Sequence, residues 1–172
     1  MTMRLRAIAC AMIMMCALAP VSANAAEKSF GWQCVTFARQ FSGIQLFGNA
    51  WTWWNQATGR YDQGKKPAVG AVLVFKSIAN MRAGHVATVS EIVSDRVVKI
   101  THANWSIING HRGQVERDVK VVDTSPNNDW SQVKVWYAPI AAVGQRAYPT
   151  YGFIYKSAAA ALKGGTQIAS AE

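Results

Sequence analysis

A chain of 172 residues is long enough for one domain with its own hydrophobic core. Lys and Arg outnumber Asp and Glu by 18 to 9, but apart from Lys65-Lys66 the basic residues are scattered along the chain. Because the sequence contains no basic run, we expect no nucleic-acid partner. The excess positive charge favours attraction to an anionic cell envelope, although it would also serve solubility alone.

The N-terminus, residues 1–25, has the features of a secretory signal peptide in the right order. Arg4 and Arg6 precede an apolar run over residues 7–19, and Ala23-Asn24-Ala25 offers a cleavage site. The alternative is an uncleaved membrane anchor, but the run is shorter than the roughly 20 residues that span a bilayer. We therefore expect an exported protein, periplasmic or secreted, with no stable membrane insertion after cleavage.

Removal of this segment would leave one cysteine. Cys10 and Cys16 lie within it, so Cys34 becomes the single thiol and no internal disulfide can form. A lone cysteine in an exported protein indicates a reactive thiol or an intermolecular bridge. The alternative is a buried cysteine that acts as a small hydrophobic residue.

Cys34 lies where an irregular segment changes into a helix. Val35, Ala38 and Phe41 recur at helical spacing, and Gly43 marks the expected end. A thiol at a helix N-terminus faces unpaired backbone N–H groups and the positive end of the helix dipole, and both favour the thiolate. The position of Cys34 thus predicts a nucleophile.

A second short helix is expected over residues 50–57, with Asn49 as its cap and with Trp51 and Trp54 packed in the core. Beyond it the pattern predicts strands, and no helix-length segment separates them, so the sheet should be antiparallel. The expected strands cover residues 71–75, 86–92, 97–101, 115–122 and 133–137. Helices followed by strands predict an α+β fold of N-terminal helices packed on an antiparallel sheet. The Ala- and Gly-rich residues 157–172 are expected to be a flexible tail.

Two of the expected strands form a hairpin that carries two histidines. A turn at Ser94-Asp95 places His85 opposite Asn104, whereas a turn one residue earlier places it opposite His102. In both registers these three polar residues end a face that is otherwise apolar. We expect that face to be buried under the Cys34 helix, which would bring imidazole near the sulfur.

A base within reach of a thiol, itself oriented by a third group, is what cysteine nucleophilic catalysis requires. His85 would be the base, and either His102 or Asn104 would hold its other ring nitrogen. Each histidine could instead be structural, or Cys34, His85 and His102 could bind zinc. The sequence lacks a local pair of ligands, so we expect neither a metal nor another cofactor. His111 is interpreted as a loop residue.

The sequence resembles the CHAP domain, a cysteine- and histidine-dependent amidohydrolase/peptidase of the papain-like superfamily that also includes NlpC-type enzymes. The stretches that carry the resemblance are Gln33-Cys34-Val35, residues 67–75, Gly84-His85-Val86-Ala87 and His102-Ala103-Asn104-Trp105. The resemblance implies that residues 26–156 form a catalytic domain with a papain-like core, in which helices pack on an antiparallel sheet or half-barrel.

It also implies that Cys34 is the nucleophile and His85 the general base. Many CHAP domains have Glu at the position of His102, while NlpC-type relatives have His there. Because a neutral imidazole stabilises the His85 imidazolium less than a carboxylate does, we expect a less acidic Cys34 thiol and an activity that falls as His102 protonates. Gln33 is a candidate second oxyanion donor beside the Cys34 N–H.

The function implied is that of an exported, monomeric peptidoglycan hydrolase, either an N-acetylmuramoyl-L-alanine amidase or a peptide endopeptidase. Trp32 and Trp105 adjoin the predicted catalytic positions and are candidates to line a substrate groove, with core packing as the alternative for both. Two other functions stay open. One is a catalytically silent wall-binding domain, and the other is an amidase or transglutaminase-like enzyme that acts on a non-wall amide.

Overall fold

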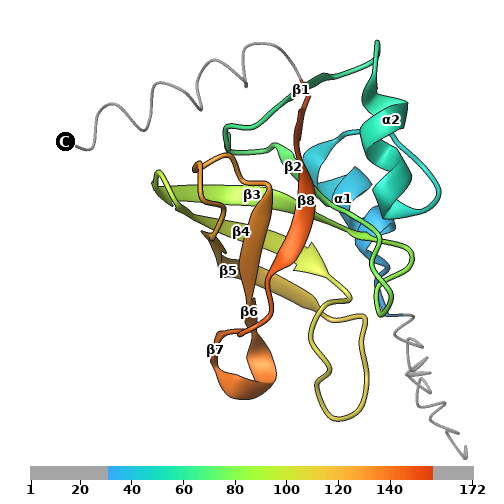
Figure 1. Ribbon diagram of the computed structural model, residues 1–172. Coiled ribbons are helices and arrows are strands. Elements are labelled where there is room, and N and C mark those ends of the chain that lie inside the picture. The colour runs from blue at the N-terminus through green and yellow to red at the C-terminus, as the bar shows by residue number, and fades with distance from the viewer. Residues whose placement is uncertain (1–30, 157–172) are drawn as a thin grey trace, which may run out of the picture.

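The computed structural model describes residues 31–156, so the expected signal peptide and C-terminal tail lie outside the described residues. The described chain is mostly β, with two short α-helices on one side of the strands (Figure 1). Neither helix has the length and apolar character that a membrane crossing requires. The elements are α1 (Cys34–Ser42), a 3-10 turn (Ala50–Thr52), α2 (Trp53–Ala57), β1 (Asp62–Gly64), β2 (Val72–Phe75), β3 (His85–Ser94), β4 (Val97–Ala103), β5 (Val115–Asp123), β6 (Gln132–Tyr137), a second 3-10 turn (Ala138–Ile140), β7 (Ala142–Val143) and β8 (Tyr148–Tyr155).

The two helices lie where the sequence predicts them. Helix α1 begins at Cys34 and ends where Gly43 takes a left-handed φ of 74° and donates its N–H to the Arg39 carbonyl. The segment expected as a second helix is divided into a 3-10 turn and α2. Asn49 precedes that turn, as predicted, but its side chain makes no capping hydrogen bond.

The sheet closes on itself. Strands β8, β2, β3, β4, β5 and β6 are antiparallel neighbours in that order, and β6 pairs again with β8 to complete a six-stranded barrel. The closing strand β8, which the sequence analysis did not predict, pairs with β2 on one side and β1 on the other. The α+β class is confirmed in this mostly β form. The expected half-barrel is instead closed, and the papain-like arrangement is not confirmed.

Two apolar cores lie on opposite faces of the barrel wall. The barrel interior contains Ala87, Val89 and Ile100, which share the face that carries the histidines. The second core lies between the helices and the outer face of the wall, where Ala38 of α1 packs with residues such as Val86. The predicted packing of α1 on the histidine face is therefore wrong. Closure of the sheet turns that face inward, and the helix packs on the opposite face, which carries Val86.

The β3–β4 hairpin brings His85 and His102 to one end of the barrel. Thr88 pairs with Thr101, and Val89 with Ile100, which is the register predicted to place His85 opposite Asn104. The tight turn, however, lies at Asp95-Arg96, one residue later than expected. Two irregularities in β3 between the turn and Val89 compensate for this difference, so the predicted register still holds near the histidines.

Candidate active site

Cys34 is the first residue of α1, and its half-buried side chain packs against the core beneath the helix. Backbone N–H groups of Val86, Val35 and Cys34 itself lie close enough to the sulfur to lower its pKa. Burial has the larger effect, however, and it raises the pKa of the thiol above its ordinary value. The helix terminus does favour the thiolate, as the sequence predicts, but burial outweighs it and leaves Cys34 a thiol at neutral pH.

His85 and His102 contact each other directly. Nε2 of His85 lies 2.9 Å from Nδ1 of His102, and the two rings are nearly perpendicular at 82°. His102, and not Asn104, is thus the residue that orients the His85 ring, which decides between the two alternatives left open by the sequence. The hydrogen bond occupies Nε2 of His85 and leaves its Nδ1 available to another group.

The sulfur lies beside the first residues of β3, because the N–H of Val86 that faces it belongs to the residue after His85. Residues 31–156 include no hydrogen bond between the Cys34 sulfur and the His85 ring. Such contacts between a nucleophile and its base are often long without substrate and shorten when substrate binds. The structure therefore places Cys34 and His85 in the same region without a hydrogen bond between them.

Aromatic rings enclose the histidine pair. Phe75, Trp105 and Tyr148 form a continuous cluster with His85, whose ring centroid lies 4.8 Å from that of Trp105 and 5.4 Å from that of Phe75. Burial in these surroundings lowers the pKa of His85 well below 6.5, and it lowers the pKa of His102 to about 3. Both imidazoles are therefore neutral at pH 7.

Trp105 is part of this enclosure and does not line a groove. Its side chain is 6% exposed, and its indole N–H donates a hydrogen bond to the Trp136 carbonyl over 3.1 Å. Of the two interpretations that the sequence allowed for Trp105, the structure supports core packing.

Asn104 contacts the segment before the nucleophile. It follows β4 in a left-handed conformation, with φ of 65°, and its side-chain N–H donates to Oε1 of Gln33 over 3.0 Å. Gln33 immediately precedes Cys34, and its side-chain amide nitrogen stays available as a donor. Asn104 thus positions a neighbour of the sulfur, although the sequence analysis proposed it as a partner of His85.

Trp32 lies on the outer side of the same segment. Its side chain is 38% exposed and rests edge-on against Phe37, with ring centroids 5.8 Å apart. Its backbone N–H donates to the Gly113 carbonyl over 2.7 Å, and this contact fastens the β4–β5 loop to the chain before α1. Only glycine fits at position 113, because a Cβ there would lie 2.4 Å from the Cα of Gly31. An exposed indole is thereby fixed two residues from Cys34.

One buried acid beside the site was missed by the sequence analysis. Glu116 of β5 pairs with His102 of β4, and its Oε1 lies 3.9 Å from Nε2 of that histidine. The residue was expected only as part of a strand over residues 115–122. Its place opposite His102 depends on the conformation of the β4–β5 loop and on an irregularity in the pairing, neither of which leaves a signal in the sequence.

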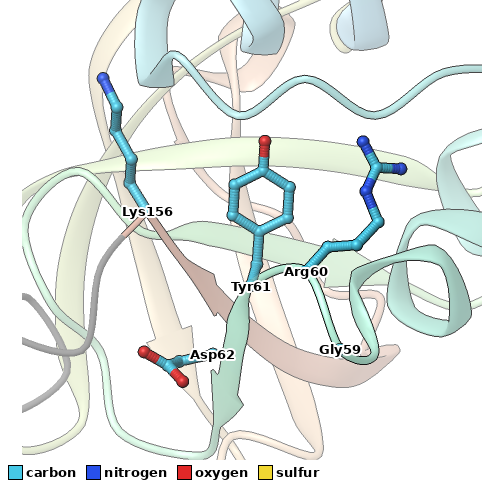
Figure 2. Close-up of a pocket in the computed structure, with 5 residues that line it drawn as sticks. All are labelled: Gly59, Arg60, Tyr61, Asp62 and Lys156. Carbon is cyan, nitrogen blue, oxygen red and sulfur yellow. The ribbon is translucent and has the colours of Figure 1, made fainter.

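Within residues 31–156, His, Cys, Asp and Glu side chains do not form any group of three or more that could hold a metal ion. The geometry thus lends no support to the zinc alternative. Away from the candidate site, a pocket of about 350 Å³ is lined by Gly59, Arg60, Tyr61, Asp62 and Lys156. Figure 2 shows the Arg60, Tyr61 and Lys156 side chains extending to one side of this pocket and Asp62 to the other. It includes none of the predicted site residues.

Comparison with known families gives one match. Residues 25–104 match the family model of the CHAP domain. The matched range includes Cys34, His85, His102 and Asn104, and it ends before β5. No curated protein matches the chain. The resemblance predicted from the sequence is therefore confirmed for these residues.

Proposed function

Because residues 25–104 belong to the CHAP family, whose members are generally cysteine- and histidine-dependent amidohydrolases or peptidases, we propose that this protein hydrolyses an amide bond of peptidoglycan. Cys34 is the nucleophile and His85 the general base. The observation that carries the proposal is the 2.9 Å contact between His85 Nε2 and His102 Nδ1, which leaves the other nitrogen of His85 free. The next residue, Val86, directs its N–H to the sulfur of Cys34 at the start of α1.

The reaction begins from a neutral pair, because burial raises the pKa of Cys34 and lowers that of His85. As the sulfur attacks the amide carbonyl, a C–S bond forms, the carbonyl electrons move to oxygen, and Nδ1 of His85 takes the thiol proton. The imidazolium that results donates from Nε2 to Nδ1 of His102, which stabilises the new charge.

Donors at the start of α1 stabilise the oxyanion. The Cys34 N–H belongs to the first turn of the helix, where backbone N–H groups have no partner within the helix. The amide nitrogen of Gln33 is the second donor, and Asn104 fixes its orientation by holding Oε1. This gives Asn104 a role in positioning the donor that stabilises the transition state.

Collapse of the tetrahedral intermediate breaks the C–N bond, and His85 gives its proton to the leaving amine. A water molecule then attacks the thioester while His85 accepts a proton from it, and the C–S bond breaks to release a carboxylic acid and regenerate the Cys34 thiol. Because the pKa of His102 is about 3, protonation of that residue affects the reaction only in strong acid, well below the pH range expected from an ordinary histidine.

We further propose that the protein is exported, to the periplasm or beyond, and acts as a monomer on the cell wall. The signal-like residues 1–25 support export, and the excess of Lys and Arg supports attraction to an anionic envelope. The exposed indole of Trp32, two residues before the nucleophile, supports contact with a sugar or stem peptide.

The test is digestion of purified sacculi by the protein and by Cys34→Ala, with released fragments identified by mass spectrometry. Fragments that appear only with intact Cys34 are expected. Free stem peptides would identify an amidase, and split crosslinks an endopeptidase. If a folded protein releases nothing across a range of pH and wall types, the proposal is wrong, and a silent wall-binding domain or a non-wall amide becomes the better explanation.

A further inference from the structure

His102 has a nitrogen that the proposed mechanism does not use. Its side chain is buried, Nδ1 contacts His85, and Nε2 has no hydrogen-bond partner. The carboxylate of Glu116 is the acidic group nearest to that nitrogen, with its Oε1 3.9 Å away. This separation exceeds hydrogen-bond length, so the interaction is electrostatic.

The Glu116 carboxylate is itself fixed in place. Its side chain is nearly buried, and Oε1 accepts from the Ser106 N–H over 2.8 Å while Oε2 accepts from the Ser106 hydroxyl over 2.7 Å. That hydroxyl also accepts from the Ala138 N–H, which ties the group to the 3-10 turn after β6. Hydrogen bonds among β5, Ser106 and the second 3-10 turn therefore fix the Glu116 carboxylate beside His102.

The position of one proton on His102 decides whether His85 can act as a base. If neutral His102 carries its proton on Nε2, its Nδ1 accepts from His85, and the second nitrogen of His85 is a free lone pair. If His102 carries its proton on Nδ1, it donates to His85, whose other nitrogen must then be protonated. Only the first arrangement leaves His85 able to take the thiol proton.

We propose that Glu116 is a positioning residue that holds the proton of His102 on Nε2 and so keeps His85 in the tautomer that acts as a base. A carboxylate attracts an N–H dipole at Nε2 and repels a lone pair there. The charged or titratable groups around the pair are Glu116 from β5, Arg112 from the β4–β5 loop and Cys34 from α1. Glu116 supplies the negative charge among them. The role rests on the proposed function, because it matters only if His85 serves as a base.

The direct test is the tautomer of His102, measured by two-bond 1H–15N correlation spectra of the protein labelled with 15N-histidine. In the unsubstituted protein we expect a protonated Nε2 and an unprotonated Nδ1 on His102, and the same tautomer on His85. Glu116→Gln should populate the other tautomer. Glu91→Gln is the matched control, because Glu91 lies on β3, pairs with exposed Lys99 and should leave both tautomers unchanged.

A second measurement is the rate at which the Cys34 thiol is alkylated. Without the Glu116 charge the His85 imidazolium is less stable, so Glu116→Gln should slow alkylation of Cys34 by iodoacetamide about tenfold at neutral pH, the order expected for one interaction with a charged group. It should also move the alkylation profile to higher pH, while Glu91→Gln retains the original profile.

Two outcomes would overturn the proposal: a proton on Nδ1 of His102 in the unsubstituted protein, or unchanged tautomers and alkylation in Glu116→Gln. The first needs no variant, so it decides the matter even if Glu116→Gln does not fold. Neither measurement uses peptidoglycan. A protein that cleaves no wall yet shows the expected tautomers would contradict the proposed substrate and still support the role of Glu116.

Discussion

The candidate site has an open side and a closed side. On the open side, Trp32 and Gln33 are exposed, Cys34 is half buried, and hydrogen bonds to residues of the β4–β5 loop hold the segment in place. On the closed side, His85 and His102 are 3% and 1% exposed within the barrel. The groups proposed to meet a substrate thus face solvent, whereas those proposed to move protons are buried. Burial also sets the resting state, since it favours the neutral form of both the thiol and the imidazoles.

The largest effect is expected from a substitution of the buried His85 on the closed side. His85→Gln removes the base and retains a polar side chain of similar size, so the rate of fragment release from sacculi should fall by about 10²- to 10⁴-fold, the usual contribution of general-base catalysis. His111→Gln is the matched control, because His111 is exposed in the β4–β5 loop and should be replaceable without loss. Similar rates for the two variants would show that the closed side does not carry the chemistry.

Acid should unfold the protein through the same two histidines. The pKa of His102 is about 3 and that of His85 is well below 6.5, so below pH 6.5 the unfolded chain binds protons that the folded chain does not. The free energy of unfolding is therefore highest above pH 6.5 and falls as the pH is lowered, by about 1.4 kcal/mol per pH unit for His102 until the pH approaches 3, and His85 adds to this fall.

Between pH 6.5 and 5 His102 alone should lower the free energy of unfolding by about 2 kcal/mol, and His85 should lower it further. Urea unfolding at several pH values measures this slope, and His85→Gln should reduce it. If His85→Gln retains the full slope, the closed side is wetter than the structure indicates.

The link between the two sides is tested by Asn104. Asn104→Gly removes the side chain that holds Gln33 and tolerates the left-handed backbone, so kcat/KM should fall by up to about tenfold while stability changes little. Asn104→Ala should lose the same activity and also about 1 kcal/mol of stability, because Ala lacks the polar side chain with which Asn tolerates a φ of 65°. Normal activity in the glycine variant would exclude a role for the Gln33 contact.

The smallest effect is expected on the open side. Trp32→Ala should weaken binding to sacculi by a few-fold, since an exposed aromatic contact contributes about 0.5–1.5 kcal/mol. Trp32→Phe, which retains a ring against Phe37, is the matched comparison. Cosedimentation with sacculi in a Cys34→Ala background measures binding without cleavage. Equal binding by all of these proteins would place the wall contact elsewhere on the surface.

Local signals explain what the sequence predicted well. Helix α1 has apolar residues at helical spacing and a glycine at its end, and the hairpin has β-branched residues in alternation. These features place Cys34 at the start of α1 and bring His85 and His102 into contact, while the hydrogen bonds of residues 31–156 do not include one between Cys34 and His85. Asn104, in its left-handed conformation, contacts Gln33 and not His85.

What the sequence did not show depends on contacts between distant segments. Strand β8 contains Pro149 and Gly152, which are poor strand formers, and it is a strand because β1, β2 and β6 provide its hydrogen-bond partners. Closure by β8 decides which face of the hairpin lies inside the barrel. It therefore explains why α1 packs on the other face of the hairpin than predicted and why Trp105 is buried. Glu116 was missed for a similar reason, since only the pairing of β4 with β5 places it beside His102.

The late position of β8 also affects how the protein is made. The ribosome synthesises β2 well before its neighbour β8, whose Phe153 pairs with Leu73, and pairings so distant in sequence form slowly. Until residues 148–155 are available, the edge of β2 is open and the core beneath α1 lacks Ile154. Until then the nascent chain cannot complete the core against which Cys34 packs. In the hydrolase proposed here, this order of assembly would delay activity until residues 148–155 have been synthesised and paired.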